Sequence, residues 1–159
     1  MTSVYRVTTW VGEAGREHVV RWLAEWTNKA LKYAHGETSP EDMVKAFQEG
    51  RMQVWAVFDD AKLVGVATTE VVDYPRLAVL RVVTLQGSNL SVWASHLLEA
   101  LLTFCKEQGL ERIEVVGRRG WVRKLAPLGF REIYSVVARE VEGVQVGRDN
   151  ANGIEKQPA

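Results

Sequence analysis

The chain has 159 residues, of which 47% are hydrophobic and 25% charged, and this predicts one globular domain with a full core. Its 20 basic and 20 acidic side chains cancel, so no overall field attracts it to nucleic acid or to an anionic membrane. The single cysteine excludes an internal disulfide and a multi-cysteine zinc site. No apolar run approaches the roughly 18 residues of a membrane span. Residues 1–6 lack a signal-peptide pattern, so we expect a cytoplasmic protein.

The first third of the chain predicts one strand and two helices. Residues 4–9 alternate well enough for a half-buried strand. Apolar residues from 19 to 30 recur at helical spacing, and four-apart ion pairs lie on the opposite face. Ser39 and Pro40 then fit the cap and the first position of a second helix, which Gly50 ends.

A β-rich region follows these helices. Residues 52–58 and 63–72 are rich in strand formers and are joined by a polar turn, so they predict a hairpin. Gly65 interrupts the second strand and indicates a bulge or a close backbone approach. A turn at 73–76 leads into a strand at 77–85, which completes an antiparallel meander.

That last strand feeds the longest predicted helix through the polar loop 86–89. Gly109 ends this helix, and backbone N–H groups at its start can hold a phosphate, although any strand-helix connection offers such groups. Cys105 falls on the apolar face and is interpreted as a core residue. The apolar face is lined at helical spacing by Trp93, Ala94, Leu97, Leu98, Leu101, Phe104 and Cys105.

The remaining elements complete the expected fold. Residues 112–116 form a short strand that a helix crossover can set parallel to its predecessor. Residues 120–128 predict a short helix or turn, residues 130–141 a long final strand, and residues 142–159 a tail without periodicity. The expected fold class is α/β, with a mixed and mostly antiparallel sheet flanked by helices. Its element order is β-α-α-β-β-β-α-β-α-β, within one domain over residues 1–141.

Several motifs in this order resemble the GCN5-related N-acetyltransferases. Residues 54–67, with their Leu-Val-Gly after the turn, resemble the second and third strands of that family. Residues 94–101 and 107–113 resemble its central helix and following strand. Residues 125–130 resemble its Leu-Gly-Phe turn into the last strands. The resemblance covers residues 4–141 and implies the fold of this family.

The resemblance also implies a cofactor and a substrate. Members of this family move an acetyl group from acetyl-CoA to a primary amine. The strand before the central helix pairs with the pantetheine, which here implies Val82, Val83 and Thr84. The start of the helix holds the pyrophosphate, and the corresponding residues are Asn89, Leu90, Ser91, Val92, Trp93 and Ala94.

The start of this helix departs from the family pattern. The family places Gln or Arg there, then two residues, glycine, one residue, and glycine or alanine, so that bare backbone can approach the phosphates. In the register that agrees with the helix, Asn89 stands at the Gln or Arg position and Val92 at the position of the first glycine. Only Ala94, at the glycine-or-alanine position, matches the family pattern. A register that starts at Gln86 keeps the first residue but shifts the helix by three. Because Val92 and Trp93 add bulk, we expect weak or absent acetyl-CoA binding.

Candidate catalytic residues are few. The family's frequent tyrosine acid corresponds to Leu125, which cannot donate a proton. Glu70 is a candidate general base toward an amine, and Tyr134 or Tyr74 a candidate acid, although a solvated side chain is the commoner interpretation of each such residue. A basic cluster near the expected phosphate site is either a ligand contact or a solvated surface: Arg118, Arg119, Arg123 and Lys124. No metal site is expected, since no ligand spacing relates His18, His35 and His96.

A second function, without catalysis, is also open. Residues 117–121, followed by Leu-Gly-Phe, resemble small phage-encoded acetyltransferase-like proteins, which include virion or assembly components. A phage-encoded member would lie in the virion. We expect the tail at 142–159 to contact another copy or a larger assembly, because a segment without a hydrophobic period cannot offset its own ordering. No nucleic-acid or membrane partner is indicated.

Overall fold

The computed structural model describes residues 1–7, 21, 23–28, 31–32, 36–144, 148–149 and 154–155. These residues form two compact units, residues 1–121 and residues 122–159, and each is described by itself. Residues 21, 23–28 and 31 are helical, and the rest of the helix expected at 19–30 lies outside the described residues. No helix in the described ranges combines the length and hydropathy that a membrane crossing requires.

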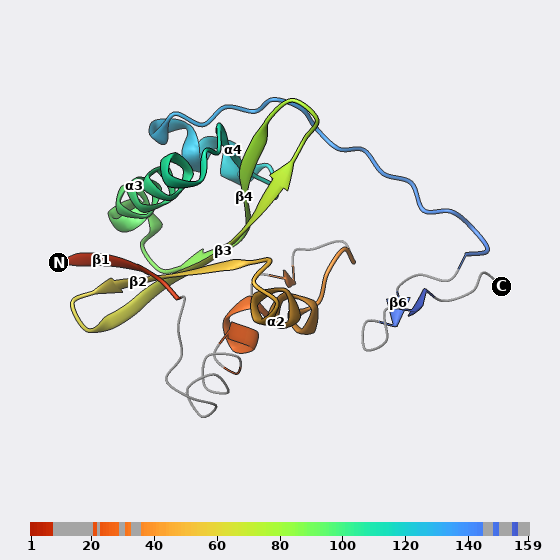
Figure 1. Ribbon diagram of the computed structural model, residues 1–159, viewed down its shortest axis with the longest axis horizontal. Coiled ribbons are helices and arrows are strands. Elements are labelled where there is room, and N and C mark those ends of the chain that lie inside the picture. The colour runs from red at the N-terminus through yellow and green to blue at the C-terminus, as the bar shows by residue number, and fades with distance from the viewer. Residues whose placement is uncertain are drawn as a thin grey trace. The chain divides into compact units, whose positions relative to one another are not determined.

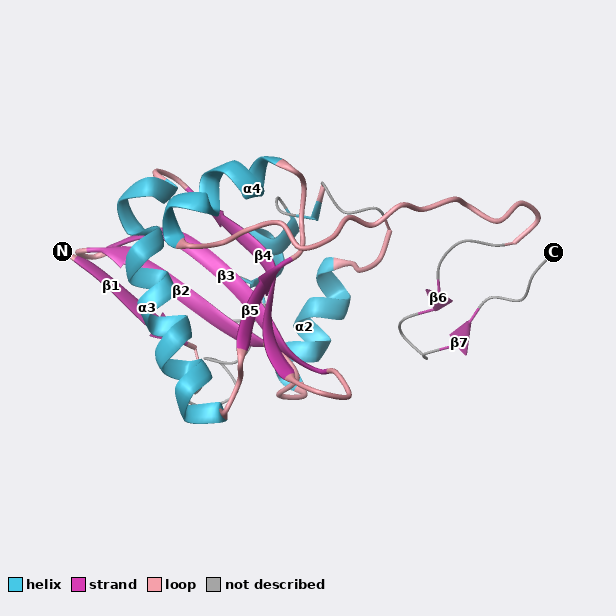
Figure 2. Ribbon diagram, turned by 90° about the horizontal axis from the view of Figure 1, so that it is seen from above, coloured by secondary structure: helices cyan, strands magenta, loops and turns pink. Residues whose placement is uncertain are grey.

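The first unit contains a five-stranded sheet with the strands in chain order (Figures 1 and 2). The first four strands are antiparallel neighbours, and β5 lies parallel to β4. This confirms the expected mixed, mostly antiparallel sheet. The first strand begins earlier than expected, and positions 8 and 9 lie outside the described residues. The strands are β1 (Thr2–Arg6), β2 (Gln53–Asp59), β3 (Lys62–Asp73), β4 (Ala78–Gly87) and β5 (Arg112–Val115).

The two long helices of this unit begin and end where their sequences indicate. Helix α2 (Pro40–Gln48) has a reciprocal cap: the Asp42 N–H donates to the Ser39 hydroxyl at 3.2 Å, and the Ser39 N–H donates to the Asp42 carboxylate at 2.9 Å. Helix α3 (Leu90–Gln108) ends at Gly109, whose φ of 70° suits glycine. The short helix α4 (Gly120–Leu125) and a 3₁₀ turn (Ala126–Leu128) follow β5.

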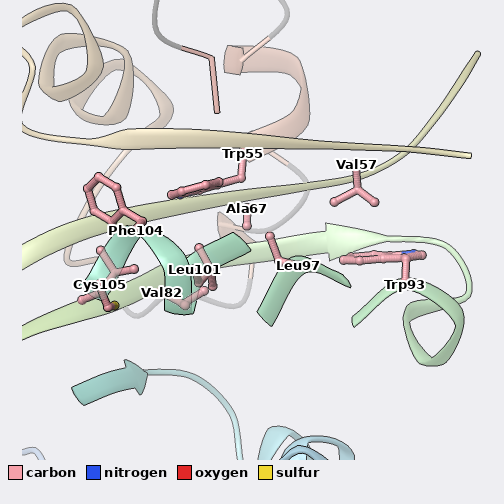
Figure 3. Close-up of a cluster of buried hydrophobic side chains, with 10 residues drawn as sticks. Trp55, Val57, Ala67, Val82, Trp93, Leu97, Leu101, Phe104 and Cys105 are labelled. Atoms are coloured by element: carbon pink, nitrogen blue, oxygen red, sulfur yellow. The ribbon is translucent and has the colours of Figure 1, made fainter. Parts of the chain in front are cut away.

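Side chains that alternate along the strands build a core on each face of the sheet. Trp55 and Ala67 pack with α3 in one cluster, and their neighbours Val54 and Val66 pack with α2 in the other. Figure 1 shows the two helices on opposite sides of the sheet. Figure 3 shows the α3 cluster, in which Trp55 and Leu101 lie between sheet and helix. Cys105 is buried in this cluster, and burial raises the pKa of its thiol.

The prediction of a final strand at 130–141 is wrong. No helix or strand is present there, and every residue from 131 to 144 is exposed. Strand-forming side chains favour a pleated surface, but a strand also needs a neighbour for its backbone hydrogen bonds. No described strand pairs with this segment. Within the expected tail, the second unit contains a short antiparallel pair, β6 (Arg148–Asp149) with β7 (Ile154–Glu155).

Adjacent leucines of α3 test the packing of this helix on the sheet. Leu101 is 3% exposed and Leu102 is 43% exposed. We expect Leu101→Ala to lower the free energy of unfolding by about 2–5 kcal/mol, because it leaves a cavity in the core. Leu102→Ala, the matched control, should change it by less than about 1 kcal/mol. Denaturant unfolding of both variants measures the difference, and equal losses would contradict this packing.

Candidate functional site

The sheet opens between β4 and β5. The parallel pairing runs from Val79 opposite Arg112 to Val82 opposite Val115 and then stops. β4 continues to Gly87 and is paired there only with β3. One backbone edge of residues 83–87 is therefore without a strand partner in the described part of the chain. Such an edge offers N–H and C=O groups to an extended ligand.

A β-bulge lies at the point where the two strands part. Thr68 of β3 is opposite Thr84, and the next residue, Thr69, is opposite Val82, so Val83 has no partner on β3. The bulge interrupts the alternation of side chains along β4: Val82 and Leu85 are three residues apart, yet both pack with the α3 cluster. Bulges bend a strand and often lie beside functional sites. This bulge lies within the predicted pantetheine-binding residues.

Three polar side chains lie next to the bulge, and the sequence pointed to Thr84 and Gln86 but not to Thr68. The hydroxyls of Thr68 and Thr84 are both buried and lie 2.6 Å apart. The Oε1 of Gln86 is buried and accepts no hydrogen bond from the described protein. An unpaired buried acceptor is costly unless a ligand or water satisfies it. Only the strand pairing identifies Thr68, since nothing in its spacing distinguishes it from other strand residues.

The loop after β4 leads directly into α3. The Ser88 N–H donates to the Val64 carbonyl at 3.0 Å, and Asn89 takes a left-handed conformation with φ of 54°. The Asn89 side chain makes no capping hydrogen bond, and the first turn of α3 carries no acidic residue. Val92 is 64% exposed on this turn. The positive end of the helix dipole is thus available to an anion.

Trp93 supports this loop from inside the protein. Its side chain is 2% exposed and its Nε1 donates to the Ser88 carbonyl at 2.7 Å. Figure 3 shows its ring beside Leu97 in the α3 cluster. The expectation that Trp93 adds bulk at the phosphate approach is therefore wrong, because its ring points into the core. Of the two bulky residues, only Val92 is presented to solvent.

The ring of Trp93 also explains why positions 65 and 87 are glycine. A Cβ atom at Gly65 would lie 2.6 Å from the indole ring, and one at Gly87 would lie 2.7 Å from it. Gly65 adjoins a register shift between β2 and β3, where Val57 is opposite Gly65 and Phe58 is opposite Leu63. Both alternatives predicted for Gly65, a bulge and a close approach, are confirmed.

The candidate base Glu70 belongs to a network on the face opposite α3. Its carboxylate lies 3.5 Å from the Arg81 guanidinium, whose second terminal nitrogen donates to the Tyr74 hydroxyl at 3.0 Å. Tyr74 in turn donates to the buried carboxylate of Glu114 at 2.9 Å, and Arg112 lies 3.3 Å from that carboxylate. Burial lowers the pKa of Arg81, but Tyr74 and the two glutamates outweigh this and raise it. Arg81 is therefore a permanent cation.

The other candidates differ in burial. Tyr134 is exposed in the irregular part of the second unit, and Leu125 is buried. The basic cluster is exposed, but it spans the two units. His96 is exposed on α3, whereas His18 and His35 lie outside the described residues. Among the residues described here, no three potential metal ligands gather.

Comparisons with known proteins agree with this geometry. Residues 17–125, more than half of the chain, match the acetyltransferase (GNAT) family. A search of the curated proteins finds no significant match. Over a hundred solved chains are similar in structure. A protein described as a probable acetyltransferase has a TM-score of 0.63 at 13% identity, covering 88% of this chain and 98% of its own.

Two further structures carry informative ligands. A predicted acetyltransferase from Clostridium acetobutylicum, determined with acetyl-CoA, has a TM-score of 0.63 at 10% identity, covering 88% of this chain and 96% of its own. An aminoglycoside acetyltransferase from an uncultured soil metagenomic sample, in complex with sisomicin, has a TM-score of 0.58 at 14% identity. That match covers 91% of this chain and 97% of its own. At these identities the likeness concerns the fold.

The contact between Gly87 and Trp93 can be tested by a single methyl group. We expect Gly87→Ala to lower the free energy of unfolding by about 1–3 kcal/mol, because its Cβ would overlap the Val64 carbonyl oxygen and the Trp93 ring. Gly120→Ala is the matched control, since a Cβ there meets nothing within 4 Å. Its effect should stay within about 0.5 kcal/mol. Denaturant unfolding compares the variants; a neutral Gly87→Ala would mean that the loop is not held against Trp93.

Proposed function

Because the chain belongs to the acetyltransferase (GNAT) family, we propose that it transfers an acetyl group from acetyl-CoA to a primary amine. The observation that carries this proposal is the edge of β4 from Val83 to Gly87, which no described strand pairs and which leads directly into the start of α3. An extended, amide-containing ligand with a phosphate at one end matches the chemistry of both parts.

The residues along this edge fit the cofactor. The backbone of Val83 and Thr84 would pair with the pantetheine amides, as an added strand does, whereas Val82, the third residue predicted for this role, is already opposite Val115 of β5. The buried, unpaired Oε1 of Gln86 offers an acceptor beside the same edge. The pyrophosphate would lie at the first turn of α3, over Asn89, Leu90, Ser91, Val92 and Ala94, with Trp93 supporting the loop from below. When bound, acetyl-CoA supplies the activated acetyl thioester.

We propose a degenerate cofactor loop because of Val92. The family places glycine where Val92 stands, and the Val92 side chain is exposed on the first turn of α3. A side chain there separates the phosphate from the backbone N–H groups, which weakens their electrostatic interaction. Trp93 does not contribute to this obstruction because its ring is buried.

Two residues are proposed for proton transfer. Glu70 would remove the proton of the amine, and its half-exposed carboxylate is oriented by Arg81. Tyr134 would return a proton to the leaving thiolate, and its hydroxyl belongs to an exposed side chain. Tyr74 is the alternative acid, although its hydroxyl already donates to Glu114.

Calorimetric titration of acetyl-CoA at neutral pH tests the cofactor proposal. We expect weak binding by the unmodified protein and tighter binding by Val92→Gly, because the substitution exposes the backbone at the helix start. The glycine should destabilise the helix by about 1 kcal/mol. Leu102→Gly is the matched control, since it carries the same helix penalty at an exposed position further along α3. Absence of binding by every variant would exclude acetyl-CoA as the cofactor, and tight binding by the unmodified protein would exclude the degenerate loop.

A non-catalytic role in assembly is the second proposal. The observation in its favour is the concentration of exposed apolar side chains after residue 130. It also rests on the resemblance of residues 117–121 to phage-encoded proteins of this fold, and a virion component is its most specific form. The tail at 142–159 would then contact another copy or a larger assembly. Self-association without acetyl-CoA binding would favour this role over acetyl transfer.

A further inference from the structure

A row of charged side chains crosses three strands of the sheet next to the opening between β4 and β5. Arg81 is opposite Glu70 of β3 on one side and opposite Glu114 of β5 on the other. Leu80 and Val82 pack in the α3 cluster, so alternation along the strand turns Arg81 to the opposite face. The row therefore lies on the polar face, two residues before the part of β4 that is proposed to bind the pantetheine.

The guanidinium of Arg81 has donors that the protein does not use. Within the described residues it forms one hydrogen bond, from Nη2 to the Tyr74 hydroxyl at 3.0 Å. The Glu70 and Glu114 carboxylates lie 3.5 and 3.7 Å from its terminal nitrogens, farther than the roughly 2.8 Å of a direct charge-assisted hydrogen bond. Its Nε is buried and has no acceptor in the described protein. A guanidinium fork with unused donors is suited to a carboxylate from a ligand.

Glu70 offers the opposite charge beside this guanidinium. The Glu70 and Arg81 side chains are 39% and 28% exposed, so a ligand in solvent can reach both. Glu114 differs, because its side chain is 6% exposed and its oxygens already accept hydrogen bonds from Tyr74 at 2.9 Å and Arg112 at 3.3 Å. Glu114 and Tyr74 therefore hold Arg81 in place, while Glu70 and Arg81 are presented to a ligand.

We propose that Glu70 and Arg81 bind the ammonium and the carboxylate of a free α-amino acid, which is then the acceptor of the proposed acetyl transfer. The acceptor role rests on that proposed function, whereas the binding site does not. In an α-amino acid the ammonium nitrogen and the carboxylate carbon are both bonded to Cα and lie about 2.5 Å apart. Glu70 and Arg81 also place opposite charges side by side, so the two pairs attract each other when they meet head to tail.

The charge of the site favours this class over polycationic amines. The two carboxylates and two guanidinium groups of the network, Glu70 and Glu114 with Arg81 and Arg112, sum to zero. A site without net charge gives a polyamine or an aminoglycoside no overall attraction. A zwitterion is itself neutral and gains a charge-assisted contact at each end.

The proton balance of the transfer agrees with this arrangement. Glu70 takes one proton from the bound ammonium, and its partly exposed carboxylate can pass this proton to solvent. The nitrogen lone pair then forms the new bond to the acetyl carbon, and the carbon–sulfur bond breaks. The nitrogen loses a second proton as the amide forms, which equals the proton that converts the leaving thiolate to a thiol. Arg81 holds the ligand carboxylate throughout.

Calorimetric titration without acetyl-CoA tests the binding site. The probes are single L-α-amino acids, each compared with its own amide, which lacks the negative charge. We expect the preferred amino acid to bind with a dissociation constant at least tenfold below that of its amide. Arg81→Gln should remove this preference, whereas Arg76→Gln, an equal charge change at an exposed position between β3 and β4, should retain it. Circular dichroism shows whether each variant is folded.

The comparison of acid with amide uses the unmodified protein, so it decides the matter even where Arg81→Gln does not fold. Equal binding of an amino acid and its amide would overturn the proposal, as would the absence of binding by every amino acid.

Acetyl transfer distinguishes this proposal from the proposed function. With acetyl-CoA present, thiol release should be at least tenfold faster with the preferred amino acid than with its amide or with ethylamine. Equal or faster transfer to the amide would overturn the acceptor class and leave acetyl transfer standing. Binding of the amino acid without transfer to any amine would refute acetyl transfer, and with it the acceptor role, while the binding site would stand.

Discussion

The packing of Trp93 is the constraint on which the rest of the site depends. Its ring fills the space beside Gly65 and Gly87, and its Nε1 holds the Ser88 carbonyl. One side chain of α3 therefore connects two strands of the sheet with the loop between β4 and α3. Because protein interiors are close-packed, the position of this ring determines the position of the loop. The start of α3 is thus presented to solvent on a rigid support, with Val92 facing outward.

The parting of β4 from β5 gives the sheet two kinds of unpaired backbone. The bulge at Val83 stops the parallel pairing and leaves the last residues of β4 with one open edge. β5, which is shorter, has no neighbouring strand on its other side in the described part of the chain. A ligand that resembles a strand suits the first edge, and a true strand suits the second.

The two faces of the sheet differ in polarity where β4 and β5 are paired. The α3 face is a continuous apolar cluster. The other face carries the network of Glu70, Arg81, Tyr74 and Glu114, in which opposite charges lie within 4 Å of one another. Buried charges persist only when they are paired and hydrogen-bonded, and here a tyrosine hydroxyl completes the set. The amine of the proposed acetyl transfer, with Glu70 as its proposed base, would meet this second face.

The sequence by itself determined the elements whose signals are local. The cap at Ser39, the end of α3 at Gly109, the strand hairpin and the family motifs each depend on residues that are close in the chain, and the structure agrees with them. Tertiary structure alone decided that Trp93 points inward, that Val83 is a bulge and that residues 130–141 form no strand. Each of these depends on a partner distant in sequence: two glycines on different strands, the register of β3, and the absence of a neighbouring strand in the described sheet. Strand propensity is a property of one segment, whereas strand formation requires a second segment that pairs with it.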